Sequence, residues 1–295
     1  MMDIEKILSQ EPRVLSQKNR EEYFSQGYTC IESFVPTEVL QGLVDVTAEL
    51  VDASRAYKDS NSTYDLGPEH SSLKPQLRRL KRPDDQHQVY WNYAKGLLAD
   101  VAADLVGPNV VFYHSKLNFK WSGGGDSVKW HQDAQFVPHT NYNVVYIGTY
   151  LEDTNMDNGP LALVKDSHEG PLYDLYDEAD EWTGCLNDRD AAEIDKSNVE
   201  YLTGPAGTIT IHNCRSLHYS PDSVASAPRP LLLNCFTAAN AKPYTPHPEP
   251  TSHSFQVVRG VAARWAALDP RPCQIPPDWS RGFTTIFENQ EPVAS

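Results

Sequence analysis

The run Trp130-His131-Gln132-Asp133 places an imidazole and a carboxylate two residues apart. In a β-strand, residues i and i+2 face the same side, so we expect His131 and Asp133 to present these groups together. Two more histidines, His212 and His218, follow an apolar stretch downstream. Two histidines and one carboxylate form the ligand set of non-haem Fe(II) oxygenases, which leaves coordination positions open. The residue types therefore indicate an iron site, with one of the later histidines as the third ligand.

An arginine near these ligands points to a co-substrate that carries a carboxylate. Arg229 comes just before an apolar segment that begins at Leu231. The open positions of such an iron site can take a 2-oxo acid and dioxygen. A buried arginine would hold the far carboxylate of that acid through two parallel hydrogen bonds, a geometry that lysine does not offer.

The N-terminal third, to about residue 107, has the pattern of helices. Ser16 can cap a helix that Gly27 ends. Thr37 can cap a second helix, from Glu38 to about Val51, and residues 89–106 predict a third, closed by Gly107-Pro108. The apolar faces of these helices should pack against a sheet.

The following residues, about 108–240, change to strand patterns separated by Gly, Pro, Asn and Asp turns. The expected strands cover residues 109–113, 143–147, 207–211 and 231–236. Short strands without intervening helices favour a mainly β fold with flanking α-helices, built on a jelly-roll core. The part from 241 to 295 is Pro-rich, with one expected helix from Phe255 to Ala267. No linker separates these parts, so we expect a single domain over residues 1–295.

Composition narrows the class of protein. The formal charge of −15 argues against a nucleic-acid surface, and no apolar stretch is long enough for a membrane helix. Five widely spaced cysteines argue against a disulfide framework, and the acidic N-terminus does not resemble a signal peptide. We therefore expect a cytoplasmic protein. One basic run, residues 74–82, is either a solvated surface or part of a site for a small anion.

From about Tyr23 to Phe236 the chain resembles the phytanoyl-CoA dioxygenase family of Fe(II)/2-oxoglutarate oxygenases. The resemblance rests on four motifs in this order: Trp130-His131-Gln132-Asp133; Asp157-Asn158-Gly159-Pro160-Leu161 followed by Asp166-Ser167-His168; Gly207-Thr208 leading to His218; and an arginine eleven residues later, at 229. The fold that it implies is a double-stranded β-helix, which is a jelly roll of cupin-like form.

The resemblance implies that His131, Asp133 and His218 hold Fe(II). The family pattern of His-x-Ser followed by arginine after eleven residues fits His218, with Ser220 in the serine position. His212 is then a neighbour of the ligands rather than a ligand. His168 belongs to a structural turn in this resemblance.

Further co-substrate contacts follow from the same resemblance. Arg229 pairs with the far carboxylate of 2-oxoglutarate, and a basic residue upstream aligns with Arg79, or with Arg78 or Lys81 if the register slips. Two other contact positions, often Met and Trp in the family, fall on Lys116 and on Gly148 or Thr149. The sequence departs at both, and we expect the missing side chain at Gly148 to widen the pocket.

The implied activity is oxidation of an unactivated C–H bond of a small organic substrate, with O2 consumed and succinate and CO2 released. The carboxylate of Asp133 favours hydroxylation over halogenation, while desaturation, epoxidation and rearrangement stay open. The acidic surface favours natural-product biosynthesis over an acyl-CoA hydroxylase of lipid catabolism. The alternatives from other classes are a non-catalytic jelly-roll binding protein and a zinc hydrolase with the same three ligands. Oligomeric state is not predicted.

Overall fold

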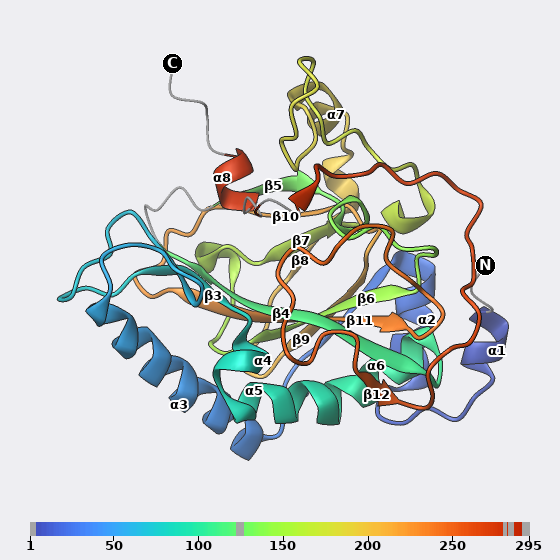
Figure 1. Ribbon diagram of the computed structural model, residues 1–295, viewed down its shortest axis with the longest axis horizontal. Helices are drawn as coiled ribbons and strands as arrows, with labels where there is room; N and C mark the ends of the chain where they lie inside the picture. Colours follow the sequence, from blue (N-terminus) through green and yellow to red (C-terminus); the bar gives the residue numbers. More distant parts are fainter. Residues whose placement is uncertain (1–3, 122–126, 280–281, 283–285, 291–295) are drawn as a thin grey trace.

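The computed structural model describes residues 4–121, 127–279, 282 and 286–290. Two antiparallel β-sheets face each other, and helices α3, α5 and α6 cover the outer face of the larger sheet (Figure 1). The helices are α1 (Ile4–Leu8), α2 (Gln17–Gln26), α3 (Thr37–Ala53), α4 (Pro83–Gln86), α5 (Gln88–Tyr93), α6 (Ala99–Val106), α7 (Asp188–Ala192) and α8 (Ile286–Gln290).

The larger sheet has the strand order β1-β9-β6-β11-β4-β3-β2, and β12 also pairs with β4. The smaller sheet has the order β5-β10-β7-β8. The strands are β1 (Tyr28–Ile31), β2 (Tyr64–Leu66), β3 (Leu77–Lys81), β4 (Val110–Lys120), β5 (Val128–His131), β6 (Val144–Tyr150), β7 (Leu161–Val164), β8 (Val199–Leu202), β9 (Ile209–Asn213), β10 (His218–Ser220), β11 (Arg229–Ala238) and β12 (Val257–Arg259). This two-sheet arrangement confirms the predicted mainly β jelly roll, although the sheets do not close into a barrel.

Side chains of β4 point alternately to two faces, of which one meets the apolar core and the other the space between the sheets. Leu117 and Phe119 point to the helices and join the main apolar core. Alternation places His114 and Lys116 on the opposite face, toward the smaller sheet, and a bulge at Tyr113, beside Cys235, returns Phe112 to the core face. A row of polar side chains therefore lines the space in which the site lies.

Two of the helix predictions hold, with a correction at one end. Ser16 accepts a hydrogen bond from the Asn19 backbone at the start of α2, and Gly27 ends α2 with φ +84°, as predicted. Thr37, however, is the first residue of α3 rather than its cap, because Pro36 occupies the cap position. The stretch 89–106 is helical but divided by a wider turn around Gly96.

The helix predicted from Phe255 to Ala267 is wrong. Residues 257–259 form strand β12 against β4, and Phe255 and Gly260 both have positive φ, +68° and +67°. These turns end the helical path at both sides, and the β-branched Val257 and Val258 suit a strand. The segment is an extended edge, not a helix.

The four predicted strands are present as β4, β6, β9 and β11. The N-terminal part also contributes strands β1, β2 and β3, which the helical pattern did not predict. All five cysteines are free, as expected. Among the described residues, no helix has the length and apolar character needed to cross a bilayer.

Candidate metal and co-substrate site

Three predicted ligands meet between the two sheets. His131 ends β5 and pairs directly with His218, the first residue of β10. Asp133 lies beyond the strand, at the start of a short 3-10 helix (Asp133–Gln135), and its carboxylate turns back toward both rings. One ligand atom from each residue lies within 4.8 Å of the others, and all three side chains are buried. The strand predicted to hold both His131 and Asp133 therefore ends earlier than expected.

Backbone carbonyls fix the tautomers of both histidines. The Nδ1 atom of His131 lies 2.8 Å from the Lys129 carbonyl oxygen, and that of His218 lies 2.9 Å from the Ser216 carbonyl oxygen. Because a carbonyl only accepts, each Nδ1 carries the hydrogen and donates it. Each Nε2 then presents its lone pair to the space near Asp133, as a metal requires.

Burial keeps these ligands in the protonation states that bind a metal. It lowers the pKa of His131 to about 4 and that of His218 well below its usual value, so both rings are neutral. Burial alone would raise the pKa of Asp133, but His218 and a hydrogen bond from His212 outweigh it and hold that pKa low. The set is two neutral imidazoles and one carboxylate.

His212 holds the Asp133 carboxylate in place through a hydrogen bond. Its Nε2 donates to Asp133 Oδ2 over 3.1 Å, and its ring stacks on Tyr146 at 5.4 Å. The structure thus groups His218 with His131 and Asp133, and it places His212 as a donor to a ligand. His168 lies elsewhere, where its Nε2 donates to the Phe24 carbonyl oxygen.

Arg229 begins β11 and lines the same hollow as the three ligands. The guanidinium is buried, and its Nε and Nη1 have no hydrogen-bond partner within the described part of the chain. Unpartnered buried donors are rare and costly, so these two indicate a binding position for a carboxylate. This observation fits 2-oxoglutarate, whose far carboxylate offers two acceptor oxygens.

The hollow at Arg229, which we call the Arg229 hollow, encloses about 640 Å³ of space including its mouth. Ser220 lines it and donates its hydroxyl to the Gly159 carbonyl oxygen at 2.9 Å. Lys120, opposite Arg229 in the sheet, donates to the Ser220 and Pro221 carbonyl oxygens. The Ser220 bond ties the end of β10 to the turn at Gly159, and the Lys120 bonds tie it to β4.

A second hollow, the Arg79 hollow, adjoins the first at His131 and Asp133 and encloses about 630 Å³ including its mouth. Arg79 lines it rather than the Arg229 hollow, whereas Lys116 lines both. Arg78 and Lys81, the alternatives to Arg79, line neither. The basic run 74–82 is thus not only solvated surface, because Arg79 on β3 is buried beside the site.

The residues of the Arg79 hollow that sequence reasoning missed include His114, His247 and Glu249. His114 could have been found from the alternation of β4, because it lies two residues before Lys116 on the same face. His247 and Glu249 reach the hollow from a loop more than 100 residues beyond Asp133, and no local pattern marks them.

The expected widening at Gly148 does not occur. A Cβ atom there would lie 2.5 Å from Thr210 Oγ1 and 3.0 Å from Leu231 Cδ1, so neighbouring side chains already fill the space. Neither Gly148 nor Thr149 lines the two hollows.

Comparison with known proteins agrees with this geometry. A sequence model of the phytanoyl-CoA dioxygenase (PhyH) family matches residues 23–231. One curated relative, "Probable alpha-ketoglutarate-dependent hypophosphite dioxygenase" of Stutzerimonas stutzeri, is 29% identical over 280 residues, covering 92% of this chain and 96% of the relative. Another, L-proline trans-4-hydroxylase of Streptomyces griseoviridis, is 28% identical over 167 residues, covering 50% of this chain and 62% of the relative.

The fold is also that of a solved oxygenase. EctD from S. alaskensis, solved with 2-oxoglutarate and 5-hydroxyectoine, superimposes with a TM-score of 0.67 at 21% identity, over 87% of this chain and 89% of that one. The matched region includes the three metal ligands and Arg229. The chain belongs to the phytanoyl-CoA dioxygenase family and is an iron- and 2-oxoglutarate-dependent dioxygenase.

Proposed function

We propose that His131, Asp133 and His218 hold the iron and that Arg229 holds the far carboxylate of 2-oxoglutarate. The observation that carries this proposal is the pair of unpartnered Arg229 donors, within the described part of the chain, in the hollow that the three ligands line. A zinc hydrolase would need the three ligands and a water molecule, but it would leave this buried guanidinium without a role.

The iron, when bound, supplies the oxidising chemistry, in which 2-oxoglutarate is decarboxylated and a substrate C–H or similar bond is oxidised. The residues of this chain prepare that step. The backbone holds the protons of His131 and His218 at Nδ1, and His212 keeps the Asp133 carboxylate ionised and oriented. Leu161, Leu231 and Leu233 line the Arg229 hollow and limit the entry of water.

We further propose that the substrate is a small polar molecule, bound in the Arg79 hollow. The named substrates of the two curated relatives, hypophosphite and L-proline, are both small and carry an anionic group. Natural-product biosynthesis, which the sequence favours, stays a prediction, and so does the alternative of an acyl-CoA substrate. With its mouth included, the Arg79 hollow encloses about 630 Å³, which is within the usual range of small-molecule sites.

A substrate panel tests this proposal. Purified protein with Fe(II), 2-oxoglutarate and O2 is incubated with small amino acids, small phosphorus oxyanions, neutral natural-product scaffolds and acyl-CoA thioesters, and succinate is measured. We expect a member of the first two groups to raise succinate formation well above the substrate-free rate. Stimulation by acyl-CoA alone would contradict the small-substrate proposal.

A further inference from the structure

Among the described residues that line the Arg79 hollow, Lys116 is the charged group without an ion-pair partner. It projects from β4 and is half-buried, and its Nζ lies 5.9 Å from the centre of the Tyr146 ring. Within the described part of the chain it makes no hydrogen bond either. Burial lowers the pKa of Lys116, against the opposing effect of the Asp133 carboxylate. An ammonium group in this position is stabilised most simply by a bound anion.

Arg79 brings a second positive charge to the same hollow. Its Nε donates to Asn118 Oδ1 at 3.1 Å, and its Nη1 lies 3.7 Å from Glu249 Oε2. The side chain is only 3% exposed, so its position is fixed by packing as well as by these contacts. A guanidinium presents its donors in a planar fork, which matches the paired oxygens of a carboxylate or phosphorus oxyanion.

The other titratable groups of the Arg79 hollow do not supply a negative charge to pair with Lys116. Asp133 is committed to the metal ligand set, and Glu249 faces Arg79. Burial lowers the pKa of His247 to about 4 and that of His114 well below its usual value, so both are neutral near pH 7. Lys116 is therefore the cation around which an anion would be placed, with Arg79 lining the same hollow.

We propose that Lys116 and Arg79 bind an oxyanion group of the substrate, a carboxylate or a phosphorus oxyanion, beside the metal ligands. This inference rests on the proposed function and assigns both residues to the substrate, where the sequence had placed them with 2-oxoglutarate. The pairing of β11 with β4 supports these separate roles for Arg229 and Lys116. Arg229 pairs with Lys120 on β4, whereas Lys116 pairs with Leu233, four residues farther along β11.

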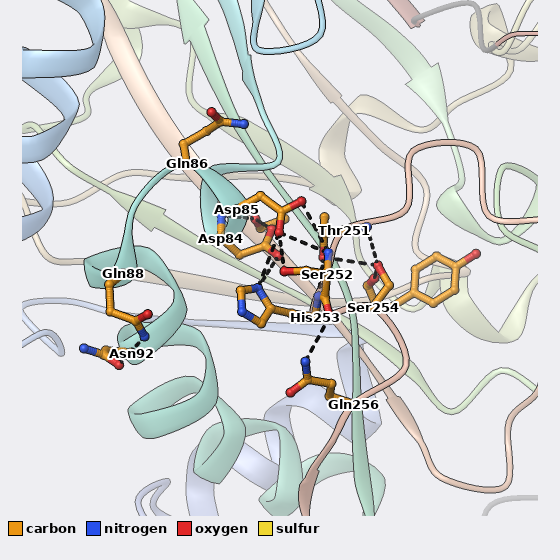
Figure 2. Close-up of polar contacts among 12 residues, drawn as sticks. Asp84, Asp85, Gln86, Gln88, Asn92, Thr251, Ser252, His253, Ser254 and Gln256 are labelled. Carbon is orange, nitrogen blue, oxygen red and sulfur yellow. Dashed lines mark hydrogen bonds and ion pairs between the residues drawn. The ribbon is translucent and has the colours of Figure 1, made fainter.

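A segment near the C-terminus, residues 243–259, contributes His247, Pro248 and Glu249 to the lining of the Arg79 hollow; we call it the strap. Figure 2 shows how the strap is anchored on α4, through Ser252 and Asp85 and through His253 and Asp84. The Ser252 hydroxyl donates to Asp85 at 2.6 Å, and the His253 ring stacks on Trp91 at 4.0 Å. The hollow is thus formed in advance, which lowers the entropic cost of binding a small anion.

Calorimetric titration of the anaerobic protein loaded with Fe(II) and 2-oxoglutarate tests the proposal. The probes are acetate and methylphosphonate, in separate titrations, because they distinguish a carboxylate from a phosphorus oxyanion. We expect at least one to bind saturably, and Lys116→Met and Arg79→Gln each to weaken its binding about tenfold or more. Lys116→Arg should retain most of the affinity, and Lys58→Met, which removes an exposed lysine, should change nothing.

The 2-oxoglutarate affinity, read in the same samples from the visible charge-transfer band, separates the possible failures. An intact band with no binding of either probe would overturn the inference and leave the proposed function standing. Loss of 2-oxoglutarate affinity in Lys116→Met, without loss of probe affinity, would overturn it by returning Lys116 to the co-substrate. No band in the unaltered protein would contradict the proposed function itself.

Discussion

The two hollows that meet at the metal ligands share His131, Asp133, Lys116, Tyr146 and Ile286, but they are built differently. The Arg229 hollow is lined mainly by strands β4, β5, β10 and β11, whose register fixes each side chain. The Arg79 hollow takes one wall from β3 and β4 and another from the strap. One side is therefore defined by regular sheet geometry and the other by an irregular segment.

We infer from this difference that the two hollows have different roles. Iron and 2-oxoglutarate impose fixed geometry, which paired strands supply with little freedom. A substrate wall made partly by an irregular segment can change in sequence without disturbing that geometry, because such segments tolerate substitution better than paired strands. We therefore expect variants in the Arg229 hollow to affect every substrate and variants in the Arg79 hollow to affect substrate choice.

The largest effect should come from His218→Ala. Removal of one of three protein ligands should lower the affinity for Fe(II) more than about 100-fold, beyond the range typical of residues that only support a ligand. Equilibrium dialysis with Fe(II) measures this directly. His87→Ala, an exposed histidine at the start of α5, is the control and should bind iron normally.

Arg229→Gln should weaken the apparent affinity for the co-substrate, raising its KM by about 30-fold or more, and leave the affinity for Fe(II) nearly unchanged. The reason is the loss of a buried charge that, in our proposal, pairs with the far carboxylate. Arg229→Lys should recover only part of the affinity, since lysine lacks the planar fork. Equal KM values in the variants and the unaltered protein would contradict the assignment.

His212→Leu should lower the affinity for Fe(II) by about tenfold, because Asp133 then loses the donor that orients it. His212→Gln places an amide donor near the position of Nε2 and should restore much of this loss. A merely structural role would predict that both variants lose stability without this difference in iron affinity. Iron dialysis and thermal unfolding, run together, separate the two cases.

Outside the site, His139 should make stability depend on pH. Burial lowers its pKa to about 4, so the folded protein leaves it neutral while the unfolded chain protonates it below its usual value of about 6.5. Stability is therefore unaffected above that value and falls as the pH drops toward 4, by about 2 kcal/mol at pH 5 from this residue. His139→Asn keeps a donor toward the Val137 carbonyl oxygen and should reduce this loss in denaturant titrations at pH 7 and pH 5.

The smallest effect should come from Ser252→Ala in the strap. This change removes the hydroxyl contact to Asp85 but leaves both hollows with all their lining residues. We expect the KM for the substrate to rise two- to fivefold, while the KM for the co-substrate stays unchanged. A parallel change in both constants would mean that the strap does not act on the Arg79 hollow alone.

The sequence predicted the Arg229 hollow better than the Arg79 hollow for a physical reason. Strand alternation and motif spacing predict that His131, Asp133, His218 and Arg229 belong to the site. This is possible because each of them lies in or beside a short, regular element. The bulge at Tyr113, which places Phe112 and His114 on opposite faces, depends on the pairing of β4 with β11, which no local pattern records. Part of the strap was predicted as a helix, and its contribution of Glu249 depends on long-range contacts that local patterns do not encode.

The central claim is that the three ligands and Arg229 form one site for iron and 2-oxoglutarate. Its most direct test is an anaerobic titration of the metal-free protein with Fe(II) and 2-oxoglutarate, followed by visible absorption. We predict a weak metal-to-ligand charge-transfer band that saturates at one equivalent of iron, persists in His212→Gln and is absent in His218→Ala. A band that survives in His218→Ala, or no band in the unaltered protein, would contradict the account.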